Sequence, residues 1–554
     1  MFKLHLDSQQ STMDWRIEGN ALVSQNGVFM PFSHPMVEVQ AVLVPPGRLG
    51  IFIFERPYCE PEPEIQLEYA ASHDELEALK YAAQSWPLHW YFLDISASGV
   101  FIDASPLASV PVFFTDNGQR LDVSWDPLTL YPLIAPILDE HRAMLYLSHF
   151  DQPYGTDTLL AQLKKLCAGH GVRWQQHSGW SIYRQPDCKR TYPKVLKKDA
   201  DPCRSFSQLL SSILQRLLPD TSVGVASGFS GGLDSSIVTA VAAKNGCNVR
   251  TYGLLMADEG RDLQEKRRNA LITQFGLQDR TIDTAVNPPQ GSYGHHPHQP
   301  MVPWEELHYA YFDAMYKQAA RDNCRVFLSG FGGDELLSEY WDEMENKTLA
   351  ISELTQPKGL PDFFSERIDA NQRVRLSQLL STPSIYAQSS VVVATSDVAA
   401  QCLRNGLWPV HLLAMPEVVQ YCHSLPREWR AKRRLMRKVL SDWGVSHLIA
   451  YPQNTESFTT LSCQALMHCQ QAQTLFPLVK LEALGWVETC KVAQAYHRWL
   501  KGEGKGKLDI HFIAMVVLES TLDSVTAAGQ SMGECWASSH NTLFAPSPND
   551  HVLK

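Results

Sequence analysis

VGVASGFSGGLDSSIVTAVAAKNG, residues 223–246, is the stretch that decides the fold of this chain. An apolar run opens into glycines and hydroxyls and then continues as an apolar segment of helical length, which predicts a strand, a tight turn and a helix. In a parallel α/β sheet such a turn lies at the carboxyl end of its strand, where these folds bind ligands. Strand-like and helix-like segments alternate after it, and from about residue 362 the sequence predicts mostly helix.

The turn has the composition of a phosphate-binding loop. Gly231 and Gly232 lack Cβ atoms, so backbone N–H groups could approach phosphate oxygens closely, and the next helix would direct its positive end at that charge. Asp234 would repel the phosphates unless a cation such as magnesium lay between them. The hydroxyl donors of the loop are Ser230, Ser235 and Ser236. The alternative is a glycine-rich turn that is merely capped by serine and aspartate.

A second stretch of the same kind, VFLSGFGGDE at Val326–Glu335, follows about 100 residues later. An apolar run again leads into glycines and then into an acid, Asp334. Two glycine-rich strand ends, each followed by an aspartate, could hold one polyphosphate and its metal ion from two sides. By itself this stretch could be an ordinary turn capped by Asp334, but the two together favour the phosphate interpretation.

The chain before this region predicts a different architecture. Short runs of aromatic and β-branched residues recur from Val37 to about Gln185, among them VEVQAVLV, GIFIFE and GVFIDA, which indicates a largely β first part. A charged, proline-bracketed segment then reads as a linker. We therefore expect an α+β domain at 1–190, a linker at 191–202, and at 203–554 an α/β parallel-sheet domain with a helical C-terminal part.

Composition excludes several classes of protein. The 554 residues carry 48 Lys and Arg against 59 Asp and Glu, a formal net charge of -11, and this balance argues against a nucleic-acid partner. We expect no apolar signal segment at the N-terminus and no membrane helix, which predicts a cytoplasmic protein. The 12 cysteines follow no disulfide or zinc spacing and are expected to be free thiols.

The two glycine-rich stretches resemble the signatures of the asparagine synthetase superfamily. SGGLDSS at 230–236 is similar to its pyrophosphate loop, and SGFGGDELLSEY at 329–340 is similar to its second ATP-side motif. Fainter similarity extends upstream to FIDASPLASVPVFFT and downstream to WPVHLLAMPEVVQYCHSLP. By this resemblance the first part would be a degenerate glutamine amidotransferase-like domain of the Ntn type, and the second an ATP pyrophosphatase domain.

The resemblance implies a reaction and a set of site residues. ATP would be cleaved between its α- and β-phosphates, a carboxylate would become an acyl-AMP, and an amine would then attack it. Asp234 and Asp334 would share Mg²⁺, and Arg433, similar to a family lysine, would join them as a catalytic group. The remaining residues expected to bind ATP are Ser230, Gly231, Gly232, Ser235 and Ser236 at the phosphates, Leu254 and Leu255 at the adenine, and Gly330, Phe331, Gly332 and Gly333 in the second motif.

Departures from the family pattern narrow the choice of reaction. Glutamine-using members carry a cysteine directly after the initiator methionine, but this chain has Phe2, so we expect no glutaminase activity from the first part. Phe331 stands where relatives place an ionisable residue that handles the amine proton. The candidates for this missing base are Glu335, Glu305 and Glu456, or the leaving phosphate itself. A family lysine also aligns with Gln453, which leaves the basic run around Arg433 as the nearest source of positive charge.

A member without the glutaminase nucleophile resembles enzymes that use an amine already present on the substrate. We favour a lasso peptide macrolactam synthetase, which joins a peptide N-terminal amine to an Asp or Glu side chain in antimicrobial peptide biosynthesis. Its partners would be a ribosomal precursor peptide, a leader-binding protein and a leader peptidase. The alternatives are a β-lactam or other small-molecule lactam synthetase, an ammonia-dependent asparagine synthetase-like enzyme, and a catalytically reduced ATP-binding protein.

Overall fold

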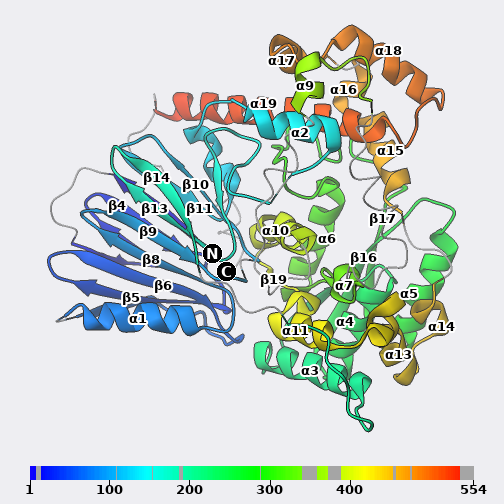
Figure 1. Ribbon diagram of the computed structural model, residues 1–554, viewed down its shortest axis with the longest axis horizontal. Helices are drawn as coiled ribbons and strands as arrows, with labels where there is room; N and C mark the ends of the chain where they lie inside the picture. Colours follow the sequence, from blue (N-terminus) through cyan, green and yellow to red (C-terminus); the bar gives the residue numbers. More distant parts are fainter. Residues whose placement is uncertain are drawn as a thin grey trace.

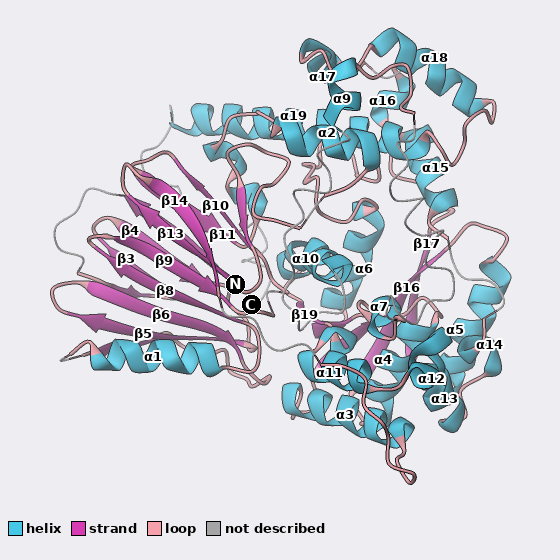
Figure 2. Cartoon of the chain, viewed as in Figure 1, coloured by secondary structure: helices cyan, strands magenta, loops and turns pink. Residues whose placement is uncertain are grey.

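The computed structural model describes residues 1–536 except 8–13, 71, 108, 153, 186–190, 287, 340–358, 372–388, 453–456 and 475–476. Two β-sheets lie face to face on one side of the molecule, and a third sheet surrounded by helices lies on the other (Figure 1). Further helices, including α9, α16, α17 and α18, gather at one end (Figure 2). The predicted fold class is confirmed.

The first part of the chain forms two seven-stranded sheets. In spatial order, the first is β12 (Lys164–Leu166), β10 (Val112–Asp116), β11 (Arg120–Ser124), β1 (Phe2–Asp7), β4 (Gly27–Pro31), β3 (Ala21–Ser24) and β2 (Arg16–Glu18). The second is β14 (Gly179–Arg184), β13 (His170–Gln175), β9 (Gly99–Ala104), β8 (Trp90–Ser96), β6 (Arg48–Glu55), β5 (Val37–Val44) and β7 (Gln66–Tyr69). Pairing is antiparallel except between β5 and β7. Buried and less buried side chains alternate along β1 and β4, as in a half-buried strand, whereas β6 and β8 are buried almost throughout.

The third sheet has five parallel strands. Their order is β17 (Gln278–Asp283), β16 (Asn248–Leu255), β15 (Gly224–Gly228), β18 (Cys324–Leu328) and β19 (Trp408–Val410). We expected the segment that contains β19 to be helical, and this was wrong for Trp408–Val410. Three residues are too few to show a period, and Pro409 is compatible with a strand only because β19 lies at the sheet edge, where one side of the backbone needs no partner.

Of the helices, the first described one packs on β5, β6 and β8 of the second sheet, and most of the others cover the parallel sheet or build the C-terminal part. In chain order they are α1 (Asp74–Ser85), α2 (Glu140–His149), α3 (Pro202–Leu217), α4 (Leu233–Lys244), α5 (Arg261–Phe275), α6 (Tyr309–Arg321), α7 (Gly333–Leu336), α9 (Glu366–Asn371), α10 (Ser389–Arg404), α11 (Pro416–Ser424), α12 (Arg427–Arg430), α13 (Arg434–Asp442), α14 (His447–Ala450), α15 (Thr459–His468), α16 (Gln470–Gln473), α17 (Val479–Ala483), α18 (Thr489–Leu500) and α19 (Asp509–Trp536). Helix α3 begins at Pro202, the last residue of the predicted linker, because the Asp201 side chain accepts a hydrogen bond from the Arg204 N–H and Pro202 suits the first turn.

One hydrophobic core crosses the predicted linker. It contains Phe2 and Tyr91 of the first part together with Phe206 of α3 and Trp408 of β19. The predicted domain boundaries stay a prediction, since a shared core does not mark where one domain ends.

Helix α19 is long and apolar enough to cross a membrane by length and composition alone. Its apolar stretch, Asp509–Ser531, has a mean hydropathy of 1.4 over its most apolar residues, and 67% of those residues are buried inside the fold. The helix packs against α2, α15 and α17 (Figure 1). Burial of this kind is typical of a core helix, so the finding is weak evidence for a membrane span.

Candidate active site

The first glycine-rich stretch forms the loop between β15 and α4. Strand β15 lies in the interior of the parallel sheet, so its carboxyl end opens directly onto the N-terminus of α4. Gly231 has a φ of +89°, a conformation that residues with a Cβ rarely adopt. The Gly232 N–H donates to Ser230 Oγ at 3.1 Å, and the Ser230 N–H donates to Ser235 Oγ at 3.3 Å. The loop is thus a tight, hydroxyl-lined turn at a helix N-terminus.

Ser236 differs from the other hydroxyls of this loop. Its side chain is fully buried, and its Oγ has no hydrogen-bond partner among the described residues. The side chain therefore lies beneath the loop, whereas Ser230 is exposed on it. The structure thus gives Ser230 better access to a phosphate than Ser236.

The second glycine-rich stretch packs against the first. It follows β18, the neighbour of β15, and leads into α7. A Cβ on Gly330 would come 2.8 Å from the Ser235 backbone nitrogen, and a Cβ on Gly333 would come 2.4 Å from Asp234 Cγ. Only glycine allows this approach at both positions. Two motifs about 100 residues apart in the sequence therefore form one site.

Asp234, Asp334 and Arg433 meet at this junction. Arg433 Nη1 lies 2.8 Å from Asp234 Oδ2 and 2.7 Å from Asp334 Oδ1. Asp334 is 79% exposed at the side chain and Asp234 only 18%. Burial is the main reason that the pKa of Asp234 rises to about 6; Arg433 opposes this rise and the nearby Asp334 adds to it. The structure brings together all three residues predicted to be catalytic.

The same residues fit a magnesium ion. Asp234 Oδ1 is buried without a hydrogen-bond partner among the described residues, and a second carboxylate, Asp334, stands beside it. Carboxylate oxygens are the ligands that Mg²⁺ prefers, usually together with substrate phosphates. Among the described residues, this site included, no group of three or more His, Cys, Asp and Glu could hold a metal ion, so two carboxylates would need substrate phosphate oxygens to complete the coordination.

Arg433 is held in an unusual backbone conformation. It has a φ of 54°, and Lys432 before it has a φ of 52°, so two consecutive residues with side chains lie in the left-handed region just before α13. The Arg437 Nε–H donates to the Lys432 carbonyl at 2.8 Å and supports this turn. Such conformations cost about 1–3 kcal/mol each and concentrate at functional sites. Here the strained turn directs the guanidinium towards the two carboxylates.

The expected adenine strand lies beside the phosphate loop. Leu254 and Leu255 are buried at the end of β16. Gln264 of α5 donates from Nε2 to the Leu254 and Ser230 carbonyls at 2.9 and 3.2 Å, and its Oε1 accepts from the Met256 N–H at 3.0 Å. Gln264 thus ties this strand to the loop. Sequence reasoning missed it, although a polar residue on a buried helix face was an available signal.

Phe331 points its ring at His411 instead of providing a base. The two ring centroids lie 5.9 Å apart, and Ser329 Oγ bonds both His411 Nδ1 at 2.6 Å and the Phe331 N–H at 3.3 Å. Burial lowers the pKa of His411 to about 3, so this imidazole is a poor proton acceptor at neutral pH. The missing base must therefore be another group.

Of the three glutamates considered as that base, Glu335 lies next to the site. Its Oε1 accepts a hydrogen bond from Ser390 Oγ at 2.6 Å. Glu305 is instead buried in an ion pair with Arg404, with N–O distances of 2.7 and 2.8 Å, so the structure argues against its role as the base. Glu456 and Gln453 lie outside the described residues.

Residues 206–449 match the family model described as asparagine synthase. This part of the chain is an asparagine synthase domain. Both glycine-rich stretches and Arg433 lie within it, and the match identifies the chain as an ATP-dependent carbon–nitrogen ligase that forms amides. A search of the curated proteins gave no match.

The solved structures that resemble the ligase include three enzymes whose activities differ from one another. A U34-tRNA thiolase from Methanococcus maripaludis is 12% identical, with 57% of this chain and 85% of that chain covered and a TM-score of 0.23. An NH3-dependent NAD synthetase from Campylobacter jejuni is 10% identical, with 55% of this chain and 95% of that chain covered and a TM-score of 0.20. An NMN synthetase from Francisella tularensis is 12% identical, with 63% of this chain and 100% of that chain covered and a TM-score of 0.21. TM-scores of this size support no argument about this chain.

Proposed function

We propose that the ligase activates an Asp or Glu side chain of a ribosomal peptide and closes a macrolactam with the amine at the peptide N-terminus, as in lasso peptide synthesis. One observation carries the amide-forming part: Arg433 joins Asp234 and Asp334 beside the phosphate loop. The amine would come from the substrate, because Phe2 offers no nucleophile for releasing ammonia from glutamine. Its ring packs against Phe29 and Tyr91, with centroids 5.7 and 5.5 Å away.

The reaction would proceed in two steps. A peptide carboxylate oxygen attacks the α-phosphorus of ATP, pyrophosphate leaves, and an acyl-AMP remains. The peptide amine then attacks the acyl carbon, AMP leaves, and the amine loses one proton. The first step leaves a highly charged product that must be stabilised, and the second needs a proton acceptor.

Residues of the site can stabilise the charged product and accept the amine proton. The Gly231 N–H, the exposed Ser230 hydroxyl and the positive end of α4 bind the leaving pyrophosphate. Arg433 offsets the negative charge that develops on the α-phosphate. A magnesium ion held by Asp234 and Asp334 would supply further charge neutralisation. Glu335 accepts the amine proton, and Ser390 holds its carboxylate in place.

The test is product analysis of the full chain with magnesium-ATP and either of two substrate mixtures. One mixture contains aspartate and ammonium, and the other a leaderless core peptide with a free N-terminal amine. The proposal expects AMP and pyrophosphate only with the peptide, together with a peptide mass lower by one water. Asp334→Asn should remove both products, and N-acetylation of the peptide should prevent the loss of water. Asparagine from the first mixture, or no AMP from the peptide, would refute the proposal.

A further inference from the structure

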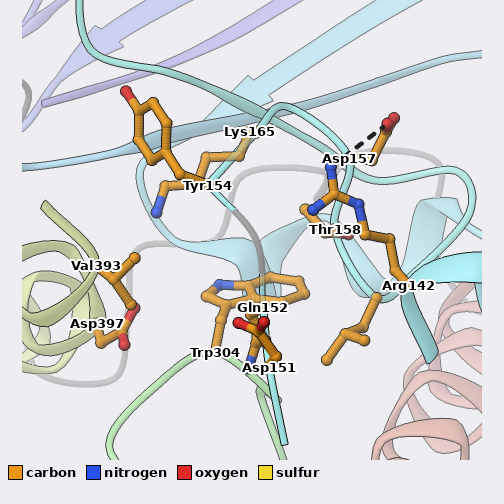
Figure 3. A pocket seen from close by; sticks show the side chains of 12 residues that line it. Arg142, Asp151, Gln152, Tyr154, Asp157, Thr158, Lys165, Trp304, Val393 and Asp397 are labelled. Atoms are coloured by element: carbon orange, nitrogen blue, oxygen red, sulfur yellow. Dashed lines mark ion pairs between the residues drawn. The ribbon is translucent and has the colours of Figure 1, made fainter. Parts of the chain in front are cut away.

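A cavity lined by none of the phosphate-loop residues lies between the first part of the chain and α10. Its volume is about 50 Å³. The residues of its wall that matter here are Arg142, Asp157 and Lys165 from the first part, Trp304 from the segment before α6, and Asp397 of α10. Figure 3 shows the indole of Trp304 lying between Asp397 on one side and Arg142 on the other. A cavity built from three separate segments can be specific in shape and charge.

Trp304 has a hydrogen-bonding group that the protein leaves unused. The side chain is 8% exposed, its ring stacks on Phe113 at 5.3 Å, and its Nε1–H has no partner among the described residues. A buried N–H without a partner costs about 1–3 kcal/mol. An indole nitrogen can only donate, so the missing partner is an acceptor, such as a ligand oxygen.

Lys165 adds a hydrogen-bond donor to the cavity wall, and Asp397 adds an acceptor. Lys165 Nζ donates to Ser396 Oγ at 2.8 Å, which uses one of its three protons. Burial is the main reason that the pKa of Asp397 rises to about 8; Lys165 opposes this rise, while Glu305 and Glu306 add to it. Lys165 would stabilise an acceptor oxygen on a ligand, and Asp397 would bind an N–H donor.

The cavity is small, which limits what can enter it. A water occupies roughly 10–15 Å³ on this measure, so the space holds about three to five non-hydrogen atoms. One peptide group with an adjoining carbon has that size. It also carries the required pair of groups, a carbonyl oxygen that accepts and an N–H that donates.

Helix α10 connects this cavity with the candidate active site. Ser390, Val393 and Asp397 lie on one face of the helix at the spacing of successive turns. Ser390 bonds Glu335 of the second motif, whereas Val393 and Asp397 line the cavity. Seven residues of helix span about 10 Å, the length of roughly three extended peptide residues.

A buried ion-pair network fixes the cavity wall. Arg404 at the end of α10 binds Asp126 of the first part at 3.1 Å through Nε, and it binds Glu305, the neighbour of Trp304, through Nη1 and Nη2. All three parts that build the wall are therefore joined. This rigidity keeps the unused Trp304 N–H in place before any ligand arrives.

We propose that this cavity binds one peptide unit of the substrate, with the peptide carbonyl oxygen on Trp304 and Lys165 and the peptide N–H on Asp397. The ligand would be a residue about three positions from the reacting carboxylate. The identity of the ligand as substrate rests on the proposed function, but the binding itself does not.

The test uses N-methylacetamide, which is a single peptide group, and the full chain without nucleotide. Indole ¹⁵N–H resonances are recorded, and the Trp304 resonance is the one that disappears in Trp304→Phe, a variant that keeps the stacked ring. Saturable movement of this resonance is expected, with at least fivefold weaker binding of N,N-dimethylacetamide, which lacks the donor. A similar weakening is expected in Asp397→Leu, which removes the acceptor. Trp15 is the matched control, because its Nε1 is also buried without a partner among the described residues but does not line the cavity.

A Trp304 resonance that does not move, or that moves equally with both amides and in Asp397→Leu, would overturn the inference. Turnover of the core peptide separates this outcome from failure of the proposed function. Trp304→Phe should raise KM for the peptide about tenfold and leave kcat unchanged. Normal turnover with an unchanged KM overturns the inference and leaves the proposed function standing. Amide binding without any peptide turnover overturns the proposed function and leaves the binding site standing.

Discussion

A methyl group at position 333 should disable the active site without unfolding the protein. The Cβ of Gly333→Ala would come 2.4 Å from Asp234 Cγ and 2.5 Å from its Oδ1. Non-bonded carbon atoms prefer roughly 3.5–4.0 Å, so the carboxylate must move by about 1 Å. Misplacement of this size costs about 100-fold in rate, equivalent to about 2.7 kcal/mol of transition-state stabilisation. Alanine is a better helix former than glycine, so α7 itself should tolerate the change.

Gly529→Ala is the matched control for this variant. Gly529 also lies in a helix, α19, and a Cβ there would meet nothing within 4 Å. AMP formation, the affinity for magnesium-ATP and the thermal unfolding midpoint are measured for both variants. Gly333→Ala should lose rate and metal-dependent nucleotide affinity at an unchanged midpoint, and Gly529→Ala should match the parent. A rate within twofold of the parent, or a loss of rate that follows a loss of fold, would refute the contact argument.

Three further variants test other parts of the structure. Asp234→Asn should abolish turnover yet raise the thermal unfolding midpoint of the metal-free protein at pH 7. Burial raises the pKa of the Asp234 carboxyl to about 6, so its ionisation destabilises the folded state as the pH rises from about 4 to above 6, and Asn removes this cost. In the parent, magnesium affinity should fall as the pH drops below about 6. Arg404→Met leaves two buried carboxylates without their cation and should cost about 3–5 kcal/mol in urea unfolding, whereas Arg367→Met, at an exposed pair, should change stability by less than about 1 kcal/mol. Cys59→Ala should leave AMP formation unchanged, because this exposed thiol lies outside the active site; a large loss would give the first part an unforeseen role.

Local sequence was informative where a period or a turn extends over several residues. The strands β5, β6 and β9 lie at the positions that their aromatic and β-branched runs predict. Strand β1 lies before Val37, where no strand was predicted, although FKLHLD alternates apolar and polar side chains as a half-buried strand does. Strand β19 gave no usable signal, because three residues reveal neither a helical nor a strand period.

The sequence by itself determined the phosphate loop, the parallel sheet that carries it and the need for a cation beside Asp234. These follow from local chemistry: glycines admit phosphate, a helix N-terminus attracts it, and a carboxylate there requires a positive charge. Only the tertiary structure decided that Gly330 and Gly333 press on the first motif, that Arg433 joins two carboxylates, and that Glu305 is buried against Arg404. Those contacts depend on which strands are neighbours in the sheet and on how the helices pack, and residues about 100 positions apart carry no local signal of their meeting.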